Sequence, residues 1–403
     1  METPKLRFKE FDGDWDTSKI DKIASVTSGG TPSRANPEYW NGDIPWVTTS
    51  LVDFNVIHSA EEFITKEGVN NSSAKLFPKD TILMAMYGQG ITRGKVAILG
   101  IEATTNQACC AIKLKDGYET QFIFQNLMNR YDEIRDLSND GGQKNLSAGI
   151  IKDIEISIPS KGEQTKIATF LSAVDEKISQ LTQKHQLLSQ YKQGMMQKLF
   201  SQQIRFKADD GSEFEGWEET IFEKIGVFLK GKGISKADIV PDGKIPCIRY
   251  GELYTYYGEV ISKIISSTNI EAKNLVLSKA NDILIPASGE TQIDIATASC
   301  VLQDNIALSG DLNIFRTKEN GIFLSYLIRS KLKMQIAQLA QGNSVVHLYA
   351  SQLKGVSFSL PCLEEQTKIA NFLSAIDQKI EVAAQQIEQA KQWKKGLLQQ
   401  MFV

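Results

Sequence analysis

The chain has 403 residues, of which 42% are hydrophobic and 23% charged, and its formal net charge is −3. This length is enough for two or three domains, each with its own core. A protein that held nucleic acid by bulk charge would be basic, so any DNA contact has to come from local loops. No apolar run approaches the roughly 20 residues of a membrane helix, and the polar N-terminus is unlike a signal peptide. We therefore expect a cytoplasmic protein that makes no membrane contact.

The five cysteines and three histidines indicate no metal site, because none of them follows a metal-ligand spacing. The cysteines form no CxxC pair, which favours reduced, structural thiols.

Residues 1–160 mix short strands with helices. The apolar runs 80–88, 95–100 and 109–115 are bounded by turn residues and predict strands. The segment 120–137 has the apolar spacing of a helix. We expect an α+β domain.

The loops of this first domain are rich in glycine and small polar residues. Such loops let the backbone approach a phosphate closely, and they carry side chains that contact base edges. Ordinary surface turns have a similar composition. The candidate DNA contacts are Gly30, Thr31, Thr48, Thr49, Gln89, Arg93, Lys95, Gln143, Lys144 and Asn145.

Two stretches of this domain resemble enzyme motifs without completing them. "GQGITRGKV" (88–96) is similar to a P-loop, but its glycines are one residue too far apart and Val96 replaces the Ser or Thr that holds Mg²⁺. "NPEY" (36–39) is similar to the Asn-Pro-Pro-aromatic motif of DNA adenine methyltransferases, with Glu38 in place of the second proline. No glycine-rich strand–turn–helix accompanies it to bind a methyl donor. Neither stretch supports catalysis.

Residues 161–200 are predicted to form one long helix. Its apolar residues, beginning with Ile167, Leu171 and Val174, recur at alternating steps of four and three, the pattern of a coiled coil. Such a helix cannot bury its apolar seam alone, so a second helix is required.

That second helix is predicted at residues 363–403, and it nearly repeats the first. "EQTKIATFLSAVDEKI" begins at Glu163, and "EQTKIANFLSAIDQKI" begins at Glu365, which is 202 positions later. "YKQGMMQKLF" (191–200) returns in the same register as "WKKGLLQQMF" (393–402). The chain is therefore interpreted as a tandem duplication.

Residues 201–362 are predicted to form a second α+β domain. They diverge from the first domain between the repeated anchors: "GGTPSRANPEYW" (29–40) has no recognisable counterpart after "LKGKGISK" (229–236). The candidate DNA contacts here are Lys230, Lys232, Arg249, Tyr250, Glu290, Asn343, Ser344 and His347. A loose carboxylate–lysine set, Asp242, Glu271 and Lys273, matches a nuclease pattern permissive enough to arise by chance.

Together these elements predict an α+β fold with two pseudo-twofold-related α/β domains separated by two long antiparallel coiled-coil helices. The same symmetry predicts that the end of the second helix lies beside the N-terminal segment "KLRFKEFDGDW" (5–15). Two equivalent domains on one helix pair also predict two DNA half-sites with a fixed gap, asymmetric because the domains differ in sequence.

The repeated helices and the opening "SGGTP…NPEYW" resemble the specificity (S) subunit of type I restriction–modification systems, and the resemblance covers nearly the whole chain. It implies two target-recognition domains, 1–160 and 201–362, and two conserved spacer helices, 161–200 and 363–403. It further implies that the chain catalyses nothing.

The implied partners are double-stranded DNA, two methyltransferase (M) subunits and restriction/translocase (R) subunits. S-adenosylmethionine, ATP and Mg²⁺ are then expected on the partner subunits, and no cofactor on this chain. Two other functions stay open at this point. One is a coiled-coil spacer protein that presents two ligand-binding domains without DNA, and the other is a self-contained nuclease that uses Asp242, Glu271 and Lys273.

Overall fold

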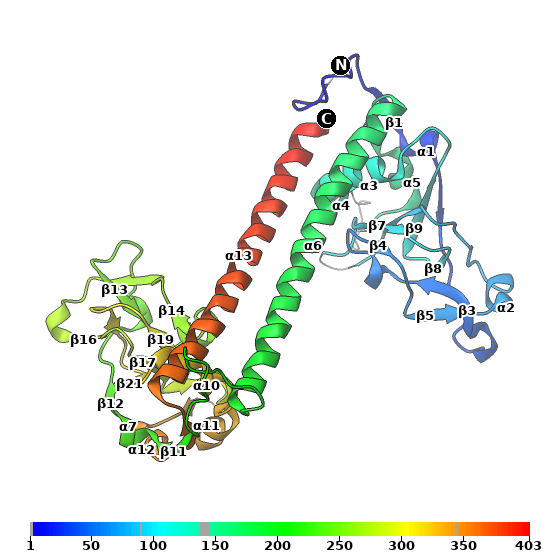
Figure 1. The fold of residues 1–403 in the computed structure, drawn as a ribbon. Helices are drawn as coiled ribbons and strands as arrows, with labels where there is room; N and C mark the ends of the chain where they lie inside the picture. Colours follow the sequence, from blue (N-terminus) through cyan, green and yellow to red (C-terminus); the bar gives the residue numbers. More distant parts are fainter. Residues whose placement is uncertain (1–2, 89–90, 138–144, 343–344) are drawn as a thin grey trace. The chain divides into compact units, whose positions relative to one another are not determined.

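The computed structural model describes residues 3–88, 91–137, 145–342 and 345–403, and its elements are labelled in Figure 1. The chain forms two compact units. Unit 1 comprises Met1–Thr182 and Gln385–Val403, and unit 2 comprises Gln183–Ala384. The two long helices, α6 (Lys161–Phe200) and α13 (Leu363–Met401), each contribute one part to unit 1 and the other part to unit 2.

Unit 1 is built on a five-stranded sheet with the strand order β2-β9-β6-β7-β4. The first three pairings are antiparallel, and the pairing of β7 with β4 is parallel. Every residue of β6 and β7 is buried, which explains why these strands read as continuous apolar runs. The strands are β2 (Ala24–Ser28), β9 (Cys109–Leu114), β6 (Ile82–Ala85), β7 (Val96–Leu99) and β4 (Val56–Ile57).

A smaller sheet of unit 1 has the order β5-β3-β8, in which β3 pairs antiparallel with β5 and parallel with β8. The strands β1 and β10 form a separate antiparallel pair. These strands are β5 (Glu62–Ile64), β3 (Trp40–Val47), β8 (Thr104–Thr105), β1 (Asp16–Lys19) and β10 (Glu155–Ile158). The short helices are α1 (Ile20–Ile23), η1 (Pro37–Tyr39), η2 (Thr49–Leu51), α2 (Lys66–Asn70), α3 (Thr120–Asn129), α4 (Tyr131–Asp136) and α5 (Ala148–Asp153).

Unit 2 repeats this topology. Its five-stranded sheet has the order β12-β21-β17-β19-β14, with the same three antiparallel pairings followed by a parallel one. The strands are β12 (Gly226–Lys230), β21 (Leu312–Thr317), β17 (Ile283–Pro286), β19 (Ser299–Val301) and β14 (Val260–Ile261). The predicted fold class, α+β with a repeated domain and two long helices, is confirmed.

The remaining elements of unit 2 complete the correspondence. The smaller sheet has the order β15-β13-β20-β16, and β11 pairs with β23 as β1 pairs with β10. These strands are β15 (Ser266–Thr268), β13 (Ile245–Ile248), β20 (Ala307–Leu308), β16 (Val276–Leu277), β11 (Glu218–Ile221), β23 (Ser357–Leu360), β18 (Ser288–Gly289) and β22 (Val346–His347). The helices are α7 (Phe222–Ile225), η3 (Lys236–Asp238), α8 (Glu252–Thr255), η4 (Ala272–Asn274), α9 (Gln292–Ile295), α10 (Gly321–Arg329), α11 (Lys333–Leu339) and α12 (Ala350–Lys354).

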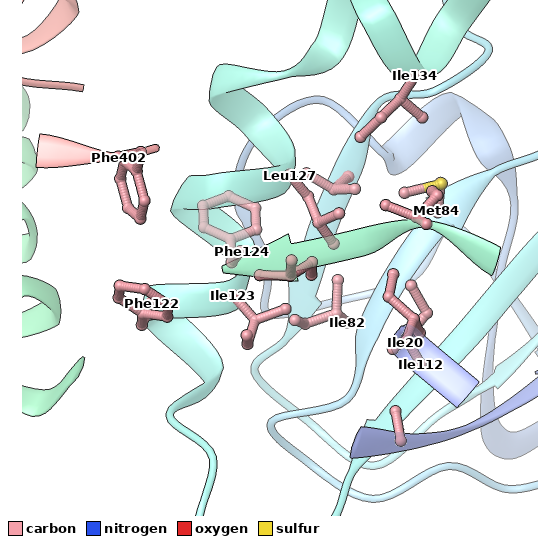
Figure 2. Close-up of a cluster of buried hydrophobic side chains, with 14 of the residues drawn as sticks. Ile20, Ile82, Met84, Ile112, Phe122, Ile123, Phe124, Leu127, Ile134 and Phe402 are labelled. Carbon is pink, nitrogen blue, oxygen red and sulfur yellow. The ribbon is translucent and has the colours of Figure 1, made fainter. Parts of the chain in front are cut away.

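In each unit the first part of one long helix packs with the last part of the other, so the pair is antiparallel there. In unit 1 the core joins Ile167, Leu171 and Val174 of α6 to Leu397, Leu398 and Met401 of α13 and to Phe402, which directly follows α13. Figure 2 shows Phe402 near Phe122 of α3, and their ring centroids lie 5.2 Å apart. In unit 2 the core joins Met196, Leu199 and Phe200 of α6 to Ile369, Leu373 and Ile376 of α13. The seam is less buried at His185 and Leu188, which are half-buried.

The repeated Glu-Gln at the start of each long helix is buried and attaches the domain to the helix. Glu163 accepts two hydrogen bonds from Arg7, at 2.7 and 2.8 Å. Gln164 accepts from the Glu119 backbone N–H, just before α3, at 3.0 Å. In unit 2, Arg205 pairs with Glu365 in the same way, at 3.1 and 2.7 Å, and Gln366 accepts from Asn320, just before α10, at 3.0 Å. Part of the repeated sequence is therefore fixed by the attachment of each domain to its helix.

The N-terminal segment lies beside the end of α13, as predicted. The Leu6 N–H donates to the Gln400 carbonyl at 2.8 Å in unit 1. The equivalent bond in unit 2 joins the Ile204 N–H to the Lys198 carbonyl at 3.3 Å, directly after α6.

We expect Arg7→Ala to lower the free energy of unfolding of unit 1 by about 3 kcal/mol, because it leaves the buried Glu163 carboxylate, 1% exposed, without a cation. Urea denaturation of the full chain, followed by circular dichroism, measures the change. Lys19→Ala is the matched control, because its partner Asp153 is 70% exposed and its loss should have little effect. Equal effects of the two substitutions would contradict the attachment role.

Candidate nucleic-acid interface

Several predicted loops of unit 1 meet at one edge of the five-stranded sheet. Strands β2 and β6 end at this edge, and β9 and β7 begin there. Backbone bonds tie the loops together: Gly29 N–H to the Cys109 carbonyl at 3.1 Å, and Met86 N–H to the Ala108 carbonyl at 2.8 Å. We call the residues 29–31, 48–50, 86–88, 106–108 and 145–146 the strand-edge cluster of unit 1.

The smaller sheet and the residues before α5 complete this cluster. Asn106 N–H donates to the Val47 carbonyl at 3.0 Å, which places Thr48 and Thr49 at the edge. Leu146 N–H donates to the Met86 carbonyl at 3.0 Å, which places Asn145 there. The structure thus brings together five of the predicted contact residues: Gly30, Thr31, Thr48, Thr49 and Asn145.

Unit 2 builds the same cluster with the same backbone bonds, from residues 231–233, 249–251, 287–289, 309–311 and 347–348. Gly231 N–H donates to the Leu312 carbonyl at 3.0 Å, and Ser309 N–H donates to the Ile248 carbonyl at 3.1 Å. Ala287 N–H donates to Asp311 at 2.9 Å, and Leu348 N–H donates to Ala287 at 3.0 Å. The loops of the two clusters therefore share one backbone conformation and hydrogen-bond pattern, although their sequences look unrelated. The corresponding pairs are Gly30 with Lys232, Thr48 with Arg249, Thr49 with Tyr250, and Asn145 with His347.

The glycines at the end of the first strand are required by close packing against the protein itself. A Cβ on Gly29 would lie 2.1 Å from Thr105 Oγ1, and one on Gly231 would lie 1.8 Å from the Ser309 carbonyl oxygen. Gly30 is buried, with its carbonyl accepting from Trp46 Nε1 at 2.9 Å. These contacts explain why glycine is needed at these positions. The sequence had suggested another reason, namely that glycine lets the backbone come close to a DNA phosphate.

The unit 1 cluster carries no charged side chain, and it includes several polar side chains and the exposed ring of Tyr87. The Thr31 hydroxyl donates to Gln107, and the hydroxyls of Thr48 and Ser50 lie 2.6 Å apart. Gln107 was not among the predicted residues, because it stands alone between two short strands, β8 and β9. Its contact with Thr31 and its equivalence to Gly310, both visible in the structure, mark it as part of the cluster.

Two predicted cations of unit 1, Arg93 and Lys95, are held by neighbouring protein groups. Arg93 Nε donates to the Arg135 carbonyl at 3.1 Å. The Lys95 ammonium lies 2.6 Å from Asp53, and its side chain is 15% exposed. Three other predicted residues of this domain, Gln89, Gln143 and Lys144, lie outside the described residues, as do Asn343 and Ser344 in the second domain. A DNA contact by any of these residues stays a prediction.

The unit 2 cluster carries the cationic and aromatic side chains of Lys232, Arg249, Tyr250 and His347, together with the exposed carboxylate of Asp311. Lys232 is exposed, as is Lys230 directly before the cluster, while Arg249 and Tyr250 are half-buried. Tyr250 and Tyr254 have ring centroids 6.4 Å apart. Partial burial raises the pKa of Tyr254, and the negative charge of Glu290 raises it further.

His347 lies at the same edge. Its Nδ1 is 3.1 Å from Ser288 Oγ, and its ring stacks on Tyr349 with centroids 6.2 Å apart. The sequence did not identify Ser288 of the cluster or its neighbours Tyr254 and Tyr349, since the place of each depends on pairing between segments distant in the chain.

Two of the motifs that resembled enzyme sites make local contacts in the structure. Asn36 of "NPEY" caps η1 by accepting from Glu38 N–H at 3.1 Å. Glu271 forms a surface ion pair with Lys273 at 2.5 Å. Across residues 3–88, 91–137, 145–342 and 345–403, no three His, Cys, Asp or Glu side chains are grouped so that they could hold a metal ion. Among the described residues, no helix has the length and apolar character to cross a membrane.

Comparison with known proteins gives consistent matches over the whole chain. The family model described as "Type I restriction modification DNA specificity domain" matches residues 12–190 and again 215–392. The type I restriction enzyme MjaIX specificity subunit of Methanocaldococcus jannaschii is 27% identical, covering 98% of this chain and 95% of the relative. The MjaVIII specificity subunit of the same organism is 24% identical, covering 97% and 94%. The crystal structure of the S subunit of a type I restriction-modification system from M. genitalium has a TM-score of 0.62 at 17% identity, covering 100% of this chain and 99% of that one.

We expect Gly231→Ala to destabilise unit 2 by about 1–3 kcal/mol, because the new methyl group would overlap the Ser309 carbonyl. The denaturation midpoint of the full chain in urea measures this. Gly258→Ala is the control in the same unit, since nothing lies within 4 Å of its added Cβ. If Gly231→Ala left the denaturation midpoint unchanged, the loop would tolerate a side chain at this position, and the close contact of Gly231 with the Ser309 carbonyl would be contradicted.

Proposed function

Because the chain belongs to the family of the type I restriction modification DNA specificity domain, which matches it twice, we propose that it is a specificity subunit that reads a bipartite, asymmetric DNA site. It directs methyltransferase and restriction subunits to that site and has no catalysis of its own.

The observation that carries this proposal is the strand-edge cluster, which is built twice on one backbone design with different side chains. Because the backbone of the cluster is shared, both domains can present equivalent loops to a DNA duplex in the same orientation. Different side chains give them different base preferences, because sequence is read by contacts to base edges. Two such readers in one chain recognise two different half-sites, and the complete site is therefore not palindromic.

The chemistry of each cluster fits DNA. In unit 1, Thr31, Thr48 and Gln107 offer hydroxyl and amide groups, which hydrogen-bond to base edges and phosphates alike. In unit 2, Arg249 is suited to a guanine, and Glu290 to the amino group of a cytosine. The exposed Lys230 and Lys232 provide contacts to phosphates. The predicted contact residues keep these roles within the proposal.

The partner subunits bind on the long helices, and each unit offers them an equivalent surface. In unit 1 this surface includes Trp393 of α13, 54% exposed and packed edge-on against Phe170 of α6, with ring centroids 6.0 Å apart. In unit 2 it includes Tyr191 of α6, which is 50% exposed and stands at the position equivalent to Trp393. Two like surfaces on one chain fit two copies of one methyltransferase.

Catalysis and cofactors belong to the partners in this proposal. The methyltransferase subunits supply S-adenosylmethionine, and the restriction subunits supply ATP and Mg²⁺. The chain contributes the DNA sequence that the complex recognises. Methyl transfer or DNA cleavage by the purified chain alone would contradict this division of roles.

We expect exchange of residues 1–160 for the equivalent domain of another specificity subunit to change only one half of the methylated site. The physical reason is that each cluster is complete within its own unit. Sequencing that detects methylated adenine, in cells that carry the chain with its methyltransferase, measures the outcome. The reciprocal exchange of 201–362 is the control and should change the other half. A change in both halves, or a palindromic site, would overturn the proposal.

We expect Tyr191→Ala and Trp393→Ala each to lose one methyltransferase subunit from the complex and the double variant to lose both. Each ring is about half exposed, and buried aromatic residues dominate most protein interfaces. Native mass spectrometry of the assembled complex counts the subunits. Tyr256→Ala is the matched control, as it removes a ring that is 62% exposed on the domain of unit 2. Full assembly by the double variant would place the docking surface elsewhere.

A further inference from the structure

Two lysines interrupt the apolar seam of the long helices at equivalent positions, Lys192 and Lys394. Their side chains are 15% and 13% exposed, respectively. In unit 2 the Lys192 ammonium lies 2.7 Å from Asp377 of α13. In unit 1 the Lys394 ammonium lies 2.6 Å from Asp175 of α6. One ion pair between the two helices is thus made twice, once in each unit.

The domain of each unit also holds the carboxylate of this pair. In unit 1, Gln125 Nε2 of α3 donates to Asp175 Oδ2 at 2.8 Å. In unit 2, the Tyr326 hydroxyl of α10 donates to Asp377. Glu259 adds a second carboxylate there, with both oxygens 2.9 Å from the Lys192 ammonium. Each aspartate is therefore fixed by a group on its domain and by a lysine on the opposite helix.

Such a pair restricts how the two helices can align. An apolar seam with a seven-residue repeat presents similar residues after a slip of one heptad, so apolar packing alone specifies the alignment weakly. A slip of even one turn would move the ammonium about 5.4 Å along the axis, out of contact with its carboxylate. A polar residue in an otherwise apolar seam is known to select one register at some cost in stability.

We propose that the pairs Lys192–Asp377 and Lys394–Asp175 set the register of α6 against α13, and that this register fixes the number of unread base pairs between the two half-sites. The second part rests on the proposed function. The lysines are then specificity-determining residues that touch no DNA. A purely stabilising role would lower the yield of folded protein and leave the gap unchanged.

The variant that tests this carries Lys192→Met, Asp377→Asn, Lys394→Met and Asp175→Asn, which removes the four charges and keeps similar side-chain volumes. In complex with the methyltransferase it should methylate the same half-sites at more than one gap, whereas the unaltered complex uses one gap. Lys391→Met is the control, because that lysine is 58% exposed and pairs with Glu388 on its own helix. Methylation at only the original gap would overturn the proposal.

A second pair of variants covers the possibility that the neutral variant does not fold. Lys394→Asp places two carboxylates together in unit 1 and should alter the gap or prevent assembly. Adding Asp175→Lys restores an ion pair with the charges exchanged, and the single original gap should return. Failure of this exchange to restore what Lys394→Asp lost would overturn the proposal as well.

A measurement without DNA separates this inference from the proposed function. Phe170→Cys with Trp393→Cys, in a Cys362→Ser background, places two thiols where the rings of α6 and α13 now touch. Oxidative cross-linking of the free chain should be efficient with the native lysines and several-fold weaker with the neutral variant. Equal cross-linking would overturn the register role even if the complex recognises a bipartite site. Absence of a bipartite site with intact cross-linking would overturn the proposed function instead.

Discussion

A helix of 40 residues with one apolar stripe cannot be stable in water without cover along its length, and this constraint shapes the rest of the molecule. Each long helix is covered in each unit by the other helix and by one α+β domain. The domain is attached by a buried glutamate and glutamine at the start of the helix. Both units cover the apolar stripe in the same way, so the two long helices have nearly the same sequence. Much of the domain surface has no such constraint and is free to differ.

Much of this architecture could be predicted from the sequence. The spacing of Ile167, Leu171 and Val174 identified the helix, and the offset of 202 residues between Glu163 and Glu365 identified the duplication. The role of that glutamate could not be predicted, because its partner Arg7 is 156 residues away along the chain. Lys192 was equally ambiguous, since a lysine near a helix end can favour the dipole, and only the structure shows Asp377 across the seam.

The strand-edge clusters show a second limit of sequence comparison. Gly30 and Lys232 keep the offset of 202 residues, but the carbonyl groups that accept from their N–H groups, those of Thr105 and Leu308, lie one position further apart. A one-residue shift between short strands is enough to hide the equivalence of Thr48 and Arg249 from the sequence. The backbone bonds reveal it because they depend on strand pairing and not on side-chain identity. The side chains at the edge of the sheet can therefore change while the backbone of the domain stays the same.

The division of each long helix between the units has a consequence for synthesis of the chain. Unit 2 begins at Gln183 and contains all of its residues once Ala384 has left the ribosome. Unit 1 begins at the first residue, yet its core includes Leu397, Leu398, Met401 and Phe402. The domain that is translated first is therefore completed only after residues 397–402 have been made, and until then its apolar helix face lacks this cover. A chain cut short between Ala384 and Leu397 would have one finished domain and one open core.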